Sequence, residues 1–221
     1  MFAVARCAVL IAVFALLLPN CSGSPRQPST ALVAPIPADC PAPGDDYFFP
    51  RGILDKSRPD SDLFSRHWYS EPLMRMGEPS LSCGREGDAE TYRFLWLRTF
   101  HHPISVRISR SLEKVEIEAF ELSGAGGYDP GIISKHISKT ASVSEWQRLE
   151  TALDSADFWN LPTNLSPETL GVDGAQWIVE GRRNGSYHVV DRWTPGASSY
   201  KALGLLFLQL AGFSVTGTEV Y

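Results

Sequence analysis

A β-hairpin signal between residues 174 and 193 constrains the fold of this chain more than any other feature. Two strand-like runs flank a turn that carries Asn184 and Gly185. The dipeptide Asn-Gly readily supplies the positive φ angles that a two-residue type I′ hairpin turn requires. Because the turn determines which residues face one another across a hairpin, the sequence also predicts the register of the two strands.

The two sides of this hairpin differ in character. One side is expected to be core, with Gly181 leaving space for the ring of His188; its pairs are Trp177 with Arg192, Val179 with Val190, and Gly181 with His188. The other side is a candidate binding patch, formed by Glu180, Arg182, Tyr187 and Asp191. An ordinary solvated sheet face with cross-strand ion pairs is the alternative. On either interpretation, Glu180→Ala combined with Arg182→Ala is expected to leave folding almost intact.

Hydrophobic periodicity predicts the remaining elements. Alternating apolar and polar residues indicate half-buried strands, and apolar residues at helical spacing indicate amphipathic helices. The predicted strands cover 91–100, 104–109, 115–120 and 132–140, a flexible loop covers Gly124–Gly127, and helices cover 145–157, capped by Ser144, and 198–213. Consecutive strands with short turns favour antiparallel pairing. The expected fold is therefore α+β, an antiparallel sheet of about six strands with two helices packed on one face, in the order ββββ-α-ββ-α.

The hairpin also carries a spaced pattern of residue types. It reads Asp173-Gly174-x-x-Trp177-x-x-Glu180, then Gly185-x-Tyr187-His188, then Arg192-Trp193-x-Pro195. This pattern resembles one shared by a family of uncharacterised bacterial secreted proteins and lipoproteins, and the resemblance covers roughly residues 145–212. No activity is known for that family, so the resemblance implies no reaction.

The N-terminus predicts export. Residues 1–6 carry one positive charge, the run Cys7–Leu18 is apolar and uncharged, and Pro19 breaks it. A signal peptide has this layout, so residues 1–20 are expected to be removed. A permanent membrane helix is the weaker alternative, because a span of the hydrocarbon core needs about 20 apolar residues.

The predicted cleavage site indicates a lipid anchor. Leu18-Pro19-Asn20-Cys21 resembles the lipobox of bacterial lipoproteins, although family members usually carry Gly, Ala or Ser where Asn20 stands. The resemblance implies that Cys21 is lipidated and that the protein lies on the periplasmic side of the cell envelope, attached to a membrane. Two or more acyl chains would make this attachment stable. With ordinary cleavage nearby, Cys21 would be a plain mature residue.

The chain after the anchor is expected to form a tether and one domain. Residues 21–46 are rich in Pro, Ser and Ala and lack apolar periodicity, which predicts a semi-extended tether. Residues 47–89, which Pro and Gly interrupt, are predicted to be an irregular N-terminal segment of the domain that residues 90–221 complete.

One disulfide is expected. Cys7 leaves with the signal peptide and Cys21 would carry lipid, so Cys40 and Cys83 remain. Two thiols in an oxidising compartment indicate a disulfide between them. Two unrelated free thiols are the alternative.

Composition and motifs exclude several classes of function. A net charge of −5 provides no basic footprint for nucleic acid and suits a soluble monomer. No cofactor is expected, since the chain has no P-loop and no dinucleotide fingerprint. No metal site is expected either: there is no Cys-x-x-Cys, and the adjacent His101 and His102 would point in opposite directions on an extended chain.

Three functions remain open. The first is a non-catalytic envelope lipoprotein domain that binds a protein or an envelope polymer, and an aromatic-rimmed flat patch would favour it. The second is an envelope hydrolase, which a pocket with a perturbed-pKa pair would favour; its candidates are His188 or His136 with Asp191, Asp173 or Asp129. The third is a secreted enzyme inhibitor, which would show an exposed rigid loop, with Gly124–Pro130 as the candidate.

Overall fold

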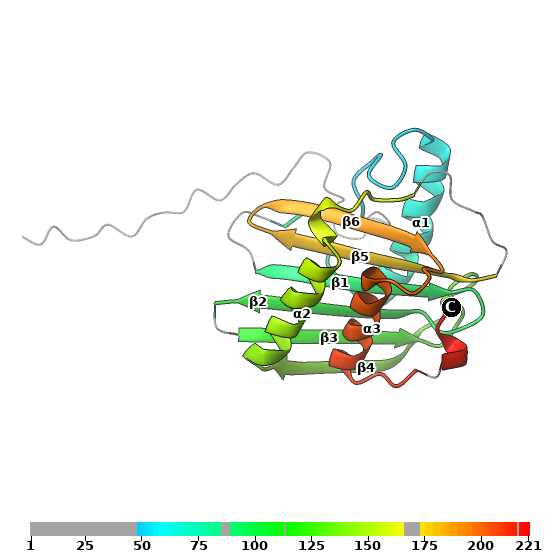
Figure 1. The fold of residues 1–221 in the computed structure, drawn as a ribbon. Coiled ribbons are helices and arrows are strands. Elements are labelled where there is room, and N and C mark those ends of the chain that lie inside the picture. Colours follow the sequence, from blue (N-terminus) through cyan, green and yellow to red (C-terminus); the bar gives the residue numbers. More distant parts are fainter. Residues whose placement is uncertain (1–47, 85–88, 113, 166–172, 216) are drawn as a thin grey trace, which may run out of the picture. The chain divides into compact units, whose positions relative to one another are not determined.

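Six antiparallel strands form one sheet in the order β4-β3-β2-β1-β5-β6 (Figure 1). The computed structural model describes residues 48–84, 89–112, 114–165, 173–215 and 217–221. The strands in these ranges are β1 (Glu90–Arg98), β2 (Ile104–Ser111), β3 (Lys114–Leu122), β4 (Ile133–Ala141), β5 (Ala175–Arg183) and β6 (Ser186–Trp193). The predicted α+β class and the six-stranded antiparallel sheet are confirmed.

Two helices cover one face of this sheet. α2 (Val143–Ser155) and α3 (Ser199–Ala211) lie side by side across it (Figure 1). Their apolar stripes meet alternate residues of the strands and form the main core, whose bulkiest members include Phe94, Trp96, Trp146, Trp177 and Phe207. Both helices lie where the periodicity predicts them.

The cap of α2 differs from the prediction, because Ser142 rather than Ser144 is the N-cap. Ser142 Oγ accepts a hydrogen bond from the Glu145 N–H at 3.2 Å, and Glu145 Oε2 accepts one from the Ser142 N–H at 2.7 Å. This reciprocal pair is a capping box. Ser144 and Gln147 fit the same pattern, but a carboxylate in the first turn also interacts favourably with the helix dipole.

The predicted hairpin register is confirmed residue by residue, from Gln176 opposite Trp193 to Arg183 opposite Ser186. Asn184 and Gly185 have φ angles of 51° and 76°, as a type I′ turn requires. The reason for glycine at 181 differs from the prediction. A Cβ there would lie 2.5 Å from the ring of Phe158, so Phe158 fills the space expected for His188.

A third helix, α1 (Pro59–Arg75), lies within the segment that was predicted to be irregular, and that prediction is wrong. The spacing of apolar residues does not indicate α1, because the polarity of its first turns is inverted: charged side chains are buried and apolar ones are exposed. Asp62 and Arg66 are buried, whereas Leu63 and Phe64 are exposed. Asp62 explains the inversion: its carboxylate accepts hydrogen bonds from the Gly52 and Leu54 N–H groups and from Arg66 Nε. The first turns of the helix thus bury charged side chains and present Leu63 and Phe64 outwards, whereas Tyr69 and Leu73 further along are buried.

The segment 48–84 covers half of the second sheet face. Its apolar side chains Phe48, Phe49, Leu54, Tyr69 and Leu73 form a second core with Leu95, Leu97, Ile178 and Val189 of β1, β5 and β6. The same face is partly buried along β2 and becomes more exposed along β3 and β4. The segment therefore belongs to one compact unit with the sheet. The predicted signal peptide and tether lie outside the described residues.

Candidate functional site

The polar side of the hairpin is buried, so the expectation of an exposed patch there is wrong. Glu180 is 0%, Arg182 5% and Asp191 6% exposed, and Tyr187 is partly buried. The segment 48–84 covers them. Ligand binding by these four residues stays a prediction, and it would require that segment to move. The expected tolerance of alanine at positions 180 and 182 does not fit this burial.

Glu180 lies in a network of buried charges. Arg93 Nε donates to Glu180 Oε2 at 2.7 Å, and Nη2 lies 2.6 Å from the same oxygen in an ion pair. The Tyr187 hydroxyl donates to Glu180 Oε1 at 2.8 Å. Glu78, which comes from the covering segment, accepts from Arg93 at 3.2 Å and from Arg107 at 2.9 Å. Two guanidinium groups and two carboxylates therefore join the segment 48–84 to three strands.

Burial shifts the pKa values in this network. Burial raises the pKa of the Glu180 carboxyl, against the opposing influence of Arg93. It also raises the pKa of the Tyr187 hydroxyl well above its ordinary value, and the Glu180 charge adds to this effect. For Arg93, burial lowers the pKa, but the Glu180 and Glu78 charges outweigh it and the net shift is upward. These groups are perturbed by a dry interior rather than by an open pocket.

The other two predicted site residues have different partners. Asp191 Oδ2 accepts from the Tyr69 hydroxyl at 2.8 Å, which fixes α1 to β6. Arg182 Nη1 donates to the Leu81 carbonyl at 3.3 Å, and its guanidinium lies against Gly84, where a Cβ would be 2.0 Å from Nη1. The structure thus joins Glu180 with Tyr187, while Asp191 and Arg182 each hold a different part of the covering segment.

Sequence reasoning missed Arg93 and Glu78. Arg93 stands alone among aromatic and aliphatic residues in the run that forms β1. A charge on a strand that is buried on both faces needs an opposite charge nearby. The position of Arg93 within this apolar run could therefore have indicated a buried ion pair. Glu78 had no comparable signal, because it lies in a segment without periodicity.

The residues of the spaced hairpin pattern have structural roles. Trp177 is in the main core, Gly185 occupies the turn, and Arg192 donates to the Pro162 and Thr163 carbonyls at 2.8 Å. Trp193 and Pro195 line a cavity of about 760 Å³ that also includes Pro162 and Tyr200. The pattern describes how this hairpin folds and contains no nucleophile with a base.

The histidines proposed for a hydrolase contact other groups. The His188 ring contacts the Leu161 carbonyl at 3.0 Å through Nε2 and lies against Phe158. His136 Nε2 contacts Glu118 at 2.7 Å. Within the described ranges, neither histidine forms a hydrogen bond with Asp191, Asp173 or Asp129.

The cluster around His136 does not have the geometry of an activated nucleophile. Ser138 Oγ donates to Glu118 Oε1, so the hydroxyl and the imidazole share one carboxylate and do not contact each other. A serine nucleophile needs its base within hydrogen-bond reach. The hydrogen bonds from Ser138 and His136 hold the pKa of Glu118 below its usual value, although partial burial opposes them.

A pH effect on stability is expected from His188. Burial lowers the pKa of its imidazole below the ordinary value of 6.5, and the charge of Arg192 adds to this effect. Below pH 6.5 the unfolded chain therefore binds more protons at this site, and stability falls as pH drops towards the folded pKa. Thermal unfolding at pH 7.5 and 5.5 checks this. The difference in Tm between the two pH values should be smaller in His188→Gln than in the unsubstituted chain, whereas His136→Gln should retain it. Equal Tm differences in the two variants would contradict the assignment of the pH effect to His188.

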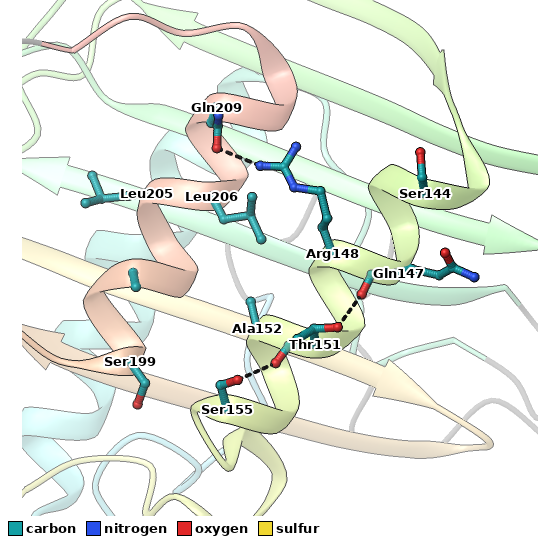
Figure 2. Close-up of a pocket in the computed structure, with 11 residues that line it drawn as sticks. Ser144, Gln147, Arg148, Thr151, Ala152, Ser155, Ser199, Leu205, Leu206 and Gln209 are labelled. Atoms are coloured by element: carbon teal, nitrogen blue, oxygen red, sulfur yellow. Dashed lines mark hydrogen bonds between the residues drawn. The ribbon is translucent and has the colours of Figure 1, made fainter.

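An apolar groove runs between α2 and α3. It measures about 810 Å³ and has Ala152, Leu205 and Leu206 along it, with Arg148 bridging to Gln209 at 2.9 Å (Figure 2). Five of its lining residues on α2 are polar (Ser144, Gln147, Arg148, Thr151 and Ser155), and the hydroxyls of Thr151 and Ser155 donate to carbonyls of their own helix (Figure 2). The Thr151 and Ser155 hydroxyls and the Arg148–Gln209 pair are thus already engaged in hydrogen bonds within the protein.

The loop between β3 and β4 is extensively hydrogen-bonded, contrary to the predicted flexible loop. Across it, Ser123 N–H donates to Ile132 O at 2.8 Å, Gly124 to Pro130, and Ala125 to Asp129, the last two at 2.9 Å. Near its tip, Gly126 donates to the Arg98 carbonyl at 3.0 Å and Gly127 to the Thr99 carbonyl at 3.2 Å. A Cβ at Gly126 would lie 2.7 Å from backbone atoms of Arg98, so glycine permits this close approach.

This loop, α1 and the turn between β1 and β2 carry an aromatic ridge, which consists of Phe64, Trp68, Phe100 and Tyr128. Trp68 is partly buried, and the other three side chains are exposed. Trp68 Nε1 donates to the Gly126 carbonyl at 2.7 Å, and Phe64 lies 5.9 Å from Trp68 between ring centroids. Tyr128, 67% exposed at the loop tip, stacks with Phe100 at 6.2 Å. The ridge therefore combines exposed aromatic rings with a backbone that hydrogen bonds fix in place.

The comparisons identify no relative. No protein-family model, curated protein or solved structure matches this chain. Among the described residues, no group of His, Cys, Asp or Glu could hold a metal ion, and no helix has the length and apolarity to cross a membrane. The aromatic ridge is thus the feature on which a functional interpretation rests.

Proposed function

We propose that this protein is a non-catalytic binding domain of the bacterial cell envelope, which recognises a partner protein through the aromatic ridge. The observation that carries the proposal is the exposure of Tyr128 on a hydrogen-bonded loop, which Trp68 of α1 contacts at Gly126, together with the exposure of Phe64 on the same helix. Aromatic residues are enriched at the cores of protein interfaces, and a preorganised loop lowers the entropic cost of binding.

The inverted polarity of α1 supports this proposal. A helix that served only to cover the sheet would bury its apolar residues, yet Leu63 and Phe64 are 42% and 67% exposed. Asp62 instead accepts hydrogen bonds from the Gly52 and Leu54 N–H groups of the preceding loop, and Arg66 pairs with Asp62 within the helix. Contiguous exposed apolar surface on a soluble domain marks interaction sites.

The location is part of the proposal and rests on the N-terminal sequence. The signal-peptide layout and the lipobox resemblance at Cys21 indicate export and attachment to the periplasmic side of the envelope. The predicted disulfide at Cys83 fits an oxidising compartment. The predicted partner, Cys40, lies outside the described residues, so the pairing stays a prediction.

Site-specific photocrosslinking in the organism's own envelope tests the proposal. A photoreactive phenylalanine analogue replaces Tyr128 in the full chain with its own leader. The matched control carries it at Leu112, which is 94% exposed at the opposite end of β3. A partner captured only from position 128 is identified by mass spectrometry and purified, and Tyr128→Ser should weaken its binding at least tenfold without changing the Tm. A Cys21→Ser chain should release the complex from the membrane fraction.

Two results would contradict the proposal. Capture of the same proteins from both positions would mean that the ridge is not selective. An unchanged affinity of the purified partner for the Tyr128→Ser chain would place binding elsewhere.

A secreted enzyme inhibitor is a second candidate, and the hydrogen-bonded loop Ser123–Ile132 favours it. Inhibitor loops present side chains on a backbone that changes little on binding. The same crosslinking experiment separates the two candidates, because an inhibitor would be captured on an enzyme whose activity falls when the purified domain is added.

A further inference from the structure

β4 is an open edge of the sheet. It is nine residues long, pairs only with β3, and is exposed along most of its length. In the described part of the chain, no backbone or side-chain group donates to or accepts from its outer side. Long unprotected edges offer a template for another strand.

The backbone groups that face outwards can be identified. Leu122 N–H donates to the Pro103 carbonyl, so Leu122 and the even-numbered residues of β3 direct their backbone groups towards β2. Hydrogen-bonded and non-hydrogen-bonded pairs alternate in antiparallel ladders. The odd-numbered residues of β3 therefore pair with β4, and the outward-facing backbone groups of β4 belong to His136, Ser138 and Thr140.

The charges of β4 select the partner strand. Lys135 and Lys139 lie on the same side of the strand, and β4 contains no acidic residue. A second copy paired antiparallel about Ile137 would place Lys135 opposite Lys139, and like charges directly opposite each other are destabilising. An extended segment with two acidic residues four positions apart would instead place a carboxylate near each lysine.

The edge is continuous with the surface proposed for binding. Ile132 and Ile133, 73% and 44% exposed, connect the loop that carries Tyr128 to the start of β4. A partner that contacts the aromatic ridge could thus extend a strand along β4 without crossing another element of the fold.

We infer that β4 binds an extended acidic segment of the partner protein by strand addition. This inference rests on the proposed function and specifies the chemistry of the partner. Main-chain hydrogen bonds to His136, Ser138 and Thr140 provide affinity, while Lys135 and Lys139 provide selectivity, as in other complexes formed by β-augmentation.

A peptide-binding measurement tests the inference. The probes are the fluorescein-labelled peptide Thr-Glu-Val-Ile-Val-Glu-Thr and its counterpart with Lys in place of Glu, titrated with the full mature chain. The acidic peptide should bind at least tenfold more tightly. Hydrogen exchange should slow at the amides of Ser138 and at least one of its outward-facing neighbours, His136 and Thr140, a change that attraction between side chains alone would not produce.

Variants at Ser138 separate backbone pairing from side-chain effects. Ser138→Pro removes one outward N–H and is compatible with an edge strand, so binding should fall at least tenfold. Ser138→Ala loses the same hydroxyl but retains the N–H, and its affinity should stay within about twofold. If Ser138→Pro unfolds the chain, Lys135→Glu combined with Lys139→Glu takes its place and should reverse the peptide preference.

The outcomes distinguish this inference from the proposed function. Equal binding of both peptides, or undiminished binding to a folded Ser138→Pro chain, would overturn strand addition. Neither result would affect the proposed function, which capture at position 128 tests separately. Failure of capture at position 128 with selective peptide binding would overturn the role of the aromatic ridge and retain β4 as a peptide site.

Discussion

Glu180→Ala is expected to lower the free energy of unfolding by about 3–5 kcal/mol, because it leaves a buried charge without its partner. Arg93 and Glu180 are both 0% exposed. After the substitution, Arg93 and Arg107 would share only Glu78, and the Tyr187 hydroxyl would lose its acceptor. For a domain of this size, such a loss corresponds to a decrease in Tm of about 10 °C.

A guanidinium chloride titration followed by far-ultraviolet circular dichroism measures this effect. Glu116→Ala is the matched control: Glu116 is an exposed glutamate on the same sheet face, in a surface pair with Lys114, and its removal should change stability by less than about 1 kcal/mol. Arg93→Met combined with Glu180→Leu should be less destabilising than Glu180→Ala, because Glu78 retains Arg107. A loss below about 1 kcal/mol for Glu180→Ala would mean that water reaches the network.

Trp177→Ala is expected to cost about 3–5 kcal/mol, because it opens a large cavity in the main core. The ring is 0% exposed and lies 5.3 Å from Phe94 and 5.2 Å from Trp96 between centroids. On α3, Gly204 provides the room for it, since a Cβ there would lie 2.6 Å from the Trp177 ring. Neighbours fixed this closely cannot collapse fully into the space that the indole leaves.

The same titration measures the loss, and Phe64→Ala is its control. Phe64 is a large aromatic residue of the aromatic ridge and is 67% exposed, so its truncation should change stability by less than about 0.5 kcal/mol. If Trp177→Ala lowers the free energy of unfolding no more than Phe64→Ala does, the close packing around β5 that the structure indicates would be contradicted.

Local rules predicted much of the fold. The Asn184-Gly185 turn determined the register of β5 and β6, because a one-residue shift would exchange the two sides of both strands. Alternation of apolar and polar residues located β2 and β3, since their polar residues lie on the open half of the sheet. Where one face is core and the other is solvated, period-two patterning is reliable.

The covering segment was not predictable by the same rules. β1 and β5 are buried on both faces, so their patterning could not reveal what lies over the second face. The buried side of α1 mixes Tyr69 and Leu73, which pack on the sheet, with Asp62 and Arg66, which form polar contacts, so it shows no continuous apolar stripe. Long-range polar contacts leave no periodic signal in a sequence, and so the predicted patch at Glu180 and Arg182 proved to be interior.

The inverted polarity of α1 separates folding from recognition on a single helix. Asp62, Arg66 and Tyr69 hold the helix in place, while Leu63 and Phe64 contribute little to that attachment. Substitutions on the outer side can therefore accumulate at small cost in stability, because the inward contacts stay intact. Descendants of such a chain could exchange one partner for another while retaining the same scaffold, so the outer side of α1 is a surface free to diversify.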